Sequence, residues 1–150
     1  MLTDQMTPSP VIIACVPGAI PADKRERWMA TGQQVYAAVL QVQELPDGYT
    51  CRLPGDSAML LLAAEYVGLD RLCCTFLRWT LRIEPNGGPL WLHLTGSEGV
   101  KEYLRSAFET TSLLNESVAK AAGFSILSRV EINSVESAIE ATSRVKERVV

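Results

Sequence analysis

DSAMLLLAAEYVGLDRLCCTF, residues 56–76, predicts the central helix around which the other elements pack. Asp56 or Ser57 can cap a helix, because a short side-chain oxygen accepts a hydrogen bond from a backbone N–H that the first turn leaves free. The next seven residues, 58–64, include no polar side chain, and a helix that is apolar on every side is normally buried. A span across a bilayer needs ~20 apolar residues, so this run is too short for one. The stretch therefore predicts a buried central helix.

The second half of this helix has one apolar face, which ends at two adjacent cysteines. The residues at the spacing of one helical face are Leu62, Tyr66, Leu69 and Cys73. We expect Cys73 to face the core, and Cys74 to lie about 100° further round the helix. A polar stripe is expected in the same half, with Glu65, Asp70 and Arg71.

The composition is typical of one soluble globular domain. The 150 residues suffice for one core, and 47% hydrophobic and 21% charged residues are ordinary fractions. A net charge of −3 argues against nucleic-acid binding, which requires a basic surface. The polar N-terminus lacks the pattern of a signal peptide, so the cytoplasm is the expected compartment and no membrane association is expected. In the cytoplasm the four cysteines are expected to be free thiols.

Helices and hairpins are expected to alternate around the central helix. A short apolar run between prolines, residues 11–16, is typical of a buried strand. The further expected elements are a helix over 22–39, a hairpin over 40–45 and 49–53, a second hairpin over 77–84 and 90–95, and a helix over 97–108. The C-terminal part predicts a helix over 112–122 that ends at Gly123, a strand over 124–132 and a helix over 134–148.

The alternation of side chains predicts the two faces of each hairpin. With a two-residue Asp47-Gly48 turn, the core-facing residues of the first hairpin are Leu40, Val42, Tyr49, Cys51 and Leu53. The outward-facing residues are then Gln41, Gln43, Thr50 and Arg52. In the second hairpin, a pairing of Ile83 with Leu90 places Arg82 beside Trp91 and Thr80 beside His93 on the outer face.

These elements predict a two-layer α+β domain, in which an antiparallel or mixed sheet of about five strands carries helices on one face. A helix followed by a hairpin occurs twice, which indicates a faint internal repeat. We expect residues 1–9 to be a flexible leader and residues 10–108 to be the core domain. Residues 109–150 are expected to be a helix–strand–helix extension of the same domain.

DRLCCTFL at residues 70–77, the second hairpin and LTGSEGVK at residues 94–101 resemble a group of small uncharacterised bacterial proteins. That group carries an acidic residue and Arg before Cys-Cys-Pro-Phe, then a hairpin and a Leu-Thr-Gly-x-Glu-Gly-Val-Lys segment. The resemblance covers residues 11–108, and one departure is Thr75, where the group usually has proline. Since the group has no settled function, the resemblance supports the fold boundaries and implies no activity.

The cysteines carry the main chemical signal of the sequence. Cys73 and Cys74 are neighbouring soft ligands, suited to Cu(I), Zn or another soft ion, and a thiol with a lowered pKa would respond to oxidation. Two thiols do not complete a structural zinc site, which has four ligands, and cysteine more often packs as a small buried residue. A site for a soft metal or for thiol redox chemistry would therefore need Cys15 or Cys51 as well, both predicted to face the core.

The outer face of the second hairpin is the other candidate surface. It combines Arg78, Arg82, Trp91 and His93. An arginine over a tryptophan ring contributes ~0.5–1 kcal/mol when exposed, and both residue types serve as anchors in protein interfaces. Since an exposed sheet edge invites pairing, we expect this surface to form a homo-oligomer, most simply a homodimer.

No catalytic constellation is visible in the sequence. His93 is the single histidine, and the sequence contains neither a Gly-x-Ser-x-Gly elbow nor a phosphate-binding glycine loop. We therefore expect a small non-enzymatic domain that acts by binding or self-association, with no cofactor. The alternative is a thiol-dependent protein that binds a soft metal or responds to redox change at Cys73 and Cys74. An enzyme that uses the outer face is a third class.

Overall fold

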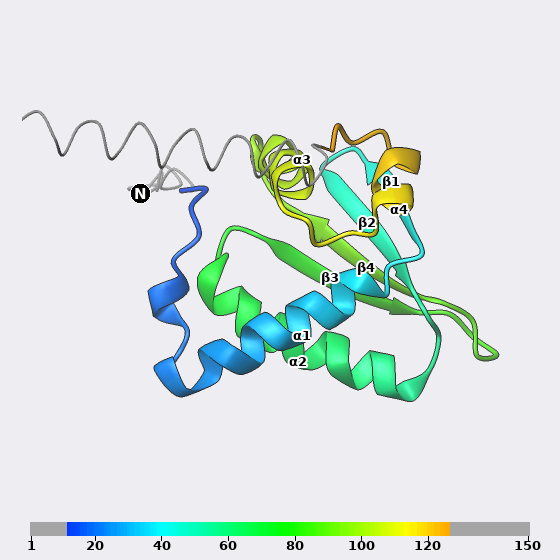
Figure 1. The fold of residues 1–150 in the computed structure, drawn as a ribbon, viewed down its shortest axis with the longest axis horizontal. Coiled ribbons are helices and arrows are strands. Elements are labelled where there is room, and N and C mark those ends of the chain that lie inside the picture. The colour runs from blue at the N-terminus through cyan, green and yellow to red at the C-terminus, as the bar shows by residue number, and fades with distance from the viewer. Residues whose placement is uncertain (1–11, 127–150) are drawn as a thin grey trace, which may run out of the picture.

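The computed structural model describes residues 12–126, which form an α+β fold (Figure 1). The helices of this part are α1 (Arg25–Ala37), α2 (Ser57–Cys73), α3 (Val100–Thr110) and α4 (Glu116–Ala121), preceded by two 3₁₀ turns at Pro17–Ala19 and Ala22–Lys24. The strands are β1 (Gln41–Leu45), β2 (Gly48–Leu53), β3 (Arg78–Ile83) and β4 (Leu90–Thr95). The expected α+β class is confirmed.

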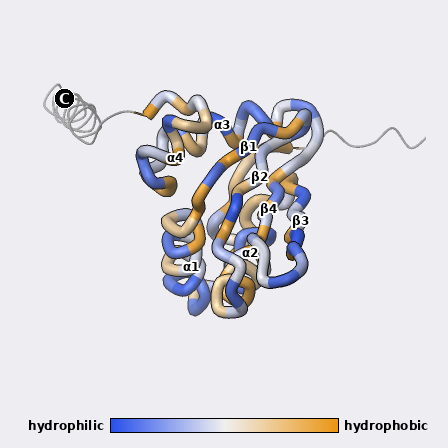
Figure 2. The backbone as a smooth tube through the Cα atoms, turned by 90° about the vertical axis from the view of Figure 1, so that its right-hand side faces the viewer, coloured by the Kyte–Doolittle hydropathy of each residue, from blue (hydrophilic) through white to orange (hydrophobic). Residues whose placement is uncertain are grey.

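The four strands of residues 12–126 form one antiparallel sheet in the order β1-β2-β4-β3 (Figure 2). The prediction of about five strands is wrong for this part of the chain, because residues 12–16 form no strand. Instead, the backbone N–H of Val16 donates to the carbonyl of Cys73 at the end of α2, over 3.0 Å. Pro17 then starts a 3₁₀ turn; it has no N–H to give to a strand ladder.

The predicted alternation of both hairpins is confirmed, but Leu40, expected to face the core, is 51% exposed, and Thr50, expected to face outward, is buried. In the first hairpin Val42 lies opposite Cys51, although the two-residue loop is Pro46-Asp47 and so begins one residue earlier than expected. A loop of the same length leaves the facing unchanged, since the side chains alternate with a period of two. In the second hairpin the expected residues lie opposite each other: Ile83 pairs with Leu90, Arg82 with Trp91, and Thr80 with His93.

The central helix begins as predicted but is less buried than predicted. The carboxylate of Asp56 caps α2 by accepting the N–H of Met59 over 2.8 Å. The first half of α2 nevertheless lies at the surface, where Leu61 is 71% exposed. α2 packs along one side only, through Ala63, Tyr66, Asp70 and Cys73. Asp70, expected in the polar stripe, is thus on the buried face, where the indole N–H of Trp28 binds its carboxylate over 2.9 Å.

Aromatic rings connect the helices to the sheet. The ring of Tyr66 in α2 meets Tyr36 of α1 edge to face at 5.5 Å and Trp79 of β3 at 5.9 Å. The ring of Phe108 in α3 lies 5.9 Å from that of Tyr36 and 6.1 Å from that of Tyr49 in β2. Edge-to-face pairs at such distances are favourable beyond the area they bury. Helices α1, α2 and α3 therefore share one core with the sheet face that carries Tyr49 and Trp79.

The C-terminal segment also contributes to this core up to residue 126. Gly123 terminates α4 as predicted, in the left-handed conformation with a φ of 85°, and the N–H of Phe124 reaches back to the carbonyl of Ala119. Phe124 is buried and stacks on Phe108 at 5.4 Å. The predicted leader, most of the predicted strand over 124–132 and the last predicted helix lie outside the described residues.

The helices within residues 12–126 include none that is both long and apolar enough to cross a membrane.

The close approach of α1 and α2 yields a stability prediction. A Cβ at Gly32 would stand 2.9 Å from Cε2 of the buried Tyr66 ring, whereas a Cβ at Gly68 would meet nothing within 4 Å. We expect Gly32→Ala to lower the free energy of unfolding by about 1–3 kcal/mol, because overpacking outweighs the better helix propensity of alanine. Gly68→Ala on the exposed side of α2 is the matched control and should raise it by up to about 1 kcal/mol. Urea denaturation measures the free energy of unfolding of both variants. An equal increase of this free energy in the two variants would contradict the described packing.

Candidate functional site

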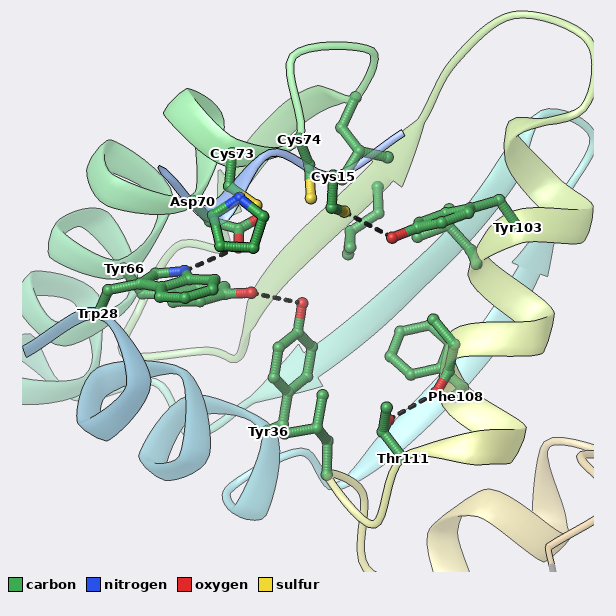
Figure 3. A pocket seen from close by; sticks show the side chains of 16 residues that line it. Cys15, Trp28, Tyr36, Tyr66, Asp70, Cys73, Cys74, Tyr103, Phe108 and Thr111 are labelled. Carbon is green, nitrogen blue, oxygen red and sulfur yellow. Dashed lines mark hydrogen bonds between the residues drawn. The ribbon is translucent and has the colours of Figure 1, made fainter. Parts of the chain in front are cut away.

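Three cysteine side chains meet where α2 ends. The Sγ atoms of Cys15, Cys73 and Cys74 all lie within 4.8 Å of one another, a spacing that could hold a metal ion (Figure 3). Cys73 is the last residue of α2, and Cys74 has left the helical conformation with a ψ of 72°. Successive residues inside a helix point about 100° apart. Because Cys74 is no longer helical, its side chain is not held at this angle, and its sulfur can lie near that of Cys73.

The third thiol comes from the segment before the first 3₁₀ turn. The backbone hydrogen bond from Val16 to Cys73 fixes this segment beside the end of α2. The Sγ of Cys15 lies 2.6 Å from the phenol oxygen of Tyr103 in α3, in a contact where either atom can be the donor. Cys15 is at the surface, so its predicted place in a buried strand is wrong.

Cys51 does not join this cluster. It lies on β2 with no exposed surface, as its predicted core-facing position requires. Burial raises the pKa of its thiol to about 12, which keeps the group protonated and unreactive at neutral pH. Either Cys15 or Cys51 was expected to complete a site with Cys73 and Cys74. In the structure Cys15 lies beside the pair, and Cys51 does not.

The thiols of the pair are also held in their neutral form. Burial raises the pKa of both Cys73 and Cys74, and the proximity of Cys15 adds to the effect on each. Burial disfavours a thiolate because the surroundings solvate its charge poorly. The free pair is thus a weak nucleophile, and it differs from the lowered-pKa thiol that a sensor of oxidation requires.

A cavity of about 240 Å³ opens beside the sulfur atoms (Figure 3). Its walls come from all three larger helices and from β4, with lining residues Cys15, Pro17, Trp28, Tyr36, Tyr66, Asp70, Cys73, Cys74, Leu77, Leu94, Tyr103, Leu104, Ala107, Phe108, Thr111 and Leu113. None of these residues is a lysine or an arginine. The cavity is therefore mainly apolar and has no cationic side chain in its wall.

The polar groups in this wall are bonded to one another. Trp28 donates to the carboxylate of Asp70, and the phenol of Tyr66 donates to the oxygen of Tyr36 over 3.2 Å. Burial raises the pKa of Asp70, while its hydrogen bonds with Trp28 and others act in the opposite direction. Sequence reasoning singled out none of these residues for the site. The available signal was the i, i+4 and i, i+3 spacing that places Tyr66, Asp70 and Cys73 on one face of α2.

The outer face of the second hairpin is separate from the cavity. The guanidinium of Arg82 lies over the ring of Trp91 at 5.8 Å, as predicted, and is also paired with Glu84 at 2.6 Å. Arg78 is exposed and His93 is partly buried. Burial lowers the pKa of His93, and the charge of Arg82 lowers it further. None of the four residues of this surface lines the thiol cavity.

Comparisons of the chain with known protein families, with curated proteins and with solved structures give no match.

The different exposures of the four thiols predict an order of reaction. Native protein treated with iodoacetamide in a phosphine reductant should be alkylated first at Cys15, which is at the surface, and last at Cys51, which is fully buried. Mass spectrometry of the digested protein measures the order, and denatured protein, in which all four thiols should react, is the control. Modification of Cys51 as fast as that of Cys15 would contradict the described core.

Proposed function

We propose that the chain binds a trivalent thiophilic metalloid ion, such as arsenic(III), through Cys15, Cys73 and Cys74. The proposal rests on one observation: three Sγ atoms from two segments that are distant in the sequence lie within 4.8 Å of one another. The function is capture of the ion by coordination, and it calls for no catalytic group.

The spacing of the sulfurs suits an ion bound by three thiolates. Arsenic(III) keeps a lone pair and binds three sulfurs in a pyramid, so its sulfurs lie closer together than the ~4.0 Å of three coplanar ligands with bonds of ~2.3 Å. Sulfurs that already lie within 4.8 Å of one another need to approach by roughly 1–1.5 Å. Small rotations of the side chains supply such a movement, and Cys15 is at the surface where rotation is least hindered.

The charge of the complex favours a trivalent ion. Three thiolates around a trivalent ion form a neutral complex, whereas a divalent ion leaves one negative charge and Cu(I) leaves two. The cavity wall offers no lysine or arginine to compensate such a charge, and an unpaired charge in poorly solvating surroundings is costly. A structural zinc ion would also lack its fourth protein ligand, since the group at ligand spacing within residues 12–126 consists of the three cysteine sulfurs and does not include Asp70.

The coordination step balances with the thiols in their protonated form. Each S–H of the site replaces one hydroxyl of arsenous acid, so that one As–S bond forms as one As–O bond breaks. The thiol proton leaves with the hydroxyl as water. Three such exchanges release three waters and transfer no net charge, and no oxidant or reductant takes part.

Binding of arsenite to site variants tests this proposal. Reduced protein with one equivalent of arsenite should gain, in native mass spectrometry, the mass of one arsenic less three hydrogens. Cys15→Ser and Cys74→Ser should each weaken binding by about tenfold or more, because the third bond forms within an already tethered complex. Cys51→Ala is the matched control, and its affinity should equal that of the original chain. Absence of binding to protein whose thiols titrate as fully reduced would overturn the proposal.

We further propose that the chain forms a homodimer through β3 and the outer face beside it. Within residues 12–126, β3 pairs only with β4 and so stands at the edge of the sheet. Ile83, at the end of β3, is 59% exposed. An unpaired edge can bond to its own copy in antiparallel fashion across a two-fold axis. The Arg82–Trp91 pair next to this edge is of the residue types that anchor interfaces.

Light scattering tests the dimer. The original chain should have twice the mass of the 16.4 kDa protomer, and the double variant Arg82→Ala/Trp91→Ala should have the mass of one protomer. Arg105→Ala, an exposed change on α3, is the control and should remain dimeric. A monomeric original chain, or a double variant of unchanged mass, would count against this interface.

A further inference from the structure

We infer that the metalloid bound at this site carries an apolar organic substituent, so that the ligand class is the trivalent organoarsenicals and related organometalloids. The inference rests on the proposed function, since it names the kind of ligand that the Cys15, Cys73 and Cys74 thiols accept. The volume, the shape and the chemistry of the adjoining cavity carry it.

The cavity is larger than an inorganic ion requires. Its volume is about 240 Å³, whereas an apolar cavity of about 150 Å³ binds benzene. In Figure 3 the three sulfur atoms lie at one end of the cavity, and Phe108 and Thr111 lie at the opposite end. An ion held by the sulfurs would leave the remainder of this space unfilled. A substituent of the size of a phenyl ring on the same atom would occupy it.

The cavity wall offers a substituent aromatic and aliphatic contacts. Side chains of Trp28, Tyr66, Leu104 and Phe108 line it. The polar side-chain atoms that line it are largely bonded to one another, in the Trp28–Asp70 and Tyr66–Tyr36 hydrogen bonds and in the contact of Cys15 with Tyr103. The buried side-chain atoms found without a partner in residues 12–126 belong to Thr50, Arg52, Trp79 and His93, and none of these lines the cavity. An uncharged apolar group therefore fits better than a charged or strongly hydrogen-bonding one.

The number of thiols is compatible with such a ligand. A monosubstituted trivalent arsenical carries one carbon and two hydroxyls on its arsenic. Two S–H groups replace these hydroxyls, forming two As–S bonds and releasing two waters, while the As–C bond is retained. The complex is neutral and leaves one of the three thiols free. Loss of one cysteine should therefore cost less for an organoarsenical than for arsenite, which needs all three.

A comparison of two organoarsenicals isolates the substituent. Methylarsonous acid and phenylarsine oxide, which is bound through its hydrate, each take two thiols and differ only in the group on arsenic. Competition titrations of the full-length reduced protein, with a phosphine as reductant, give both affinities. We expect the phenyl compound to bind about tenfold or more tightly, because the cavity buries its ring.

A variant that fills the cavity tests whether the preference for the phenyl compound comes from the cavity. Ala107 of α3 lines it, whereas the neighbouring Ser106 is exposed and does not. Ala107→Leu should remove most of the preference for the phenyl compound and leave the affinity for methylarsonous acid and arsenite unchanged. Ser106→Leu adds a side chain of the same size outside the cavity and should keep the full preference. Unchanged arsenite binding shows that each variant is folded with its thiols in place.

The outcomes separate this inference from the proposed function. A preference for phenyl that Ala107→Leu abolishes and Ser106→Leu retains supports the inference. Equal affinity of the original chain for the methyl and phenyl compounds overturns it, and so does a preference that survives in Ala107→Leu; in both cases arsenite binding leaves the proposed function standing. Failure of arsenite and both organoarsenicals to bind overturns the proposed function together with the inference.

Discussion

The hydrogen bond from the N–H of Val16 to the carbonyl of Cys73 is the contact on which the site depends. It satisfies a carbonyl in the last turn of α2, which has no partner inside the helix, and it holds the N-terminal segment against that helix end. Cys15 is one residue away from this bond, so its sulfur is delivered to the two sulfurs of α2. A strand at residues 12–16 would have directed the same backbone groups into the sheet, and the three thiols would not meet in this way. The site exists because this segment leaves the sheet and binds the end of a helix.

Much of the fold could be predicted from the sequence, since local chemistry determines it. The alternation of apolar and polar residues predicted which side chains share a face in each hairpin. Asp56 and Gly123 predicted the start of α2 and the end of α4, where the structure places them. The errors concern tertiary contacts that local pattern does not encode. The apolar run at the start of α2 predicted burial, yet no described element covers Leu61, which is 71% exposed. A run of apolar residues between two prolines predicted a strand, and no sequence signal shows that its backbone bonds to a helix end instead.

The candidate site was only half visible in the sequence. The adjacent cysteines identified Cys73 and Cys74, and two further thiols were candidates to join them, but the choice of Cys15 over Cys51 depends on how the N-terminal segment packs. The cavity was not foreseen at all. Its wall is built by α1, α2, α3 and β4, and Asp70 and Trp28 lie in it as partners that are 42 residues apart. Spacing along one helix can place Tyr66, Asp70 and Cys73 on one face; it does not show what that face meets.

X-ray absorption at the arsenic edge of the arsenite-loaded protein tests whether three thiols coordinate the ion. The spectrum reports the type and number of atoms bound to arsenic, and it is independent of affinity. The structure predicts three sulfur neighbours and no oxygen in the original chain, and two sulfurs with one oxygen in Cys15→Ser. An arsenic that keeps oxygen neighbours in the original chain, or that keeps three sulfurs without Cys15, would contradict a site built from Cys15, Cys73 and Cys74.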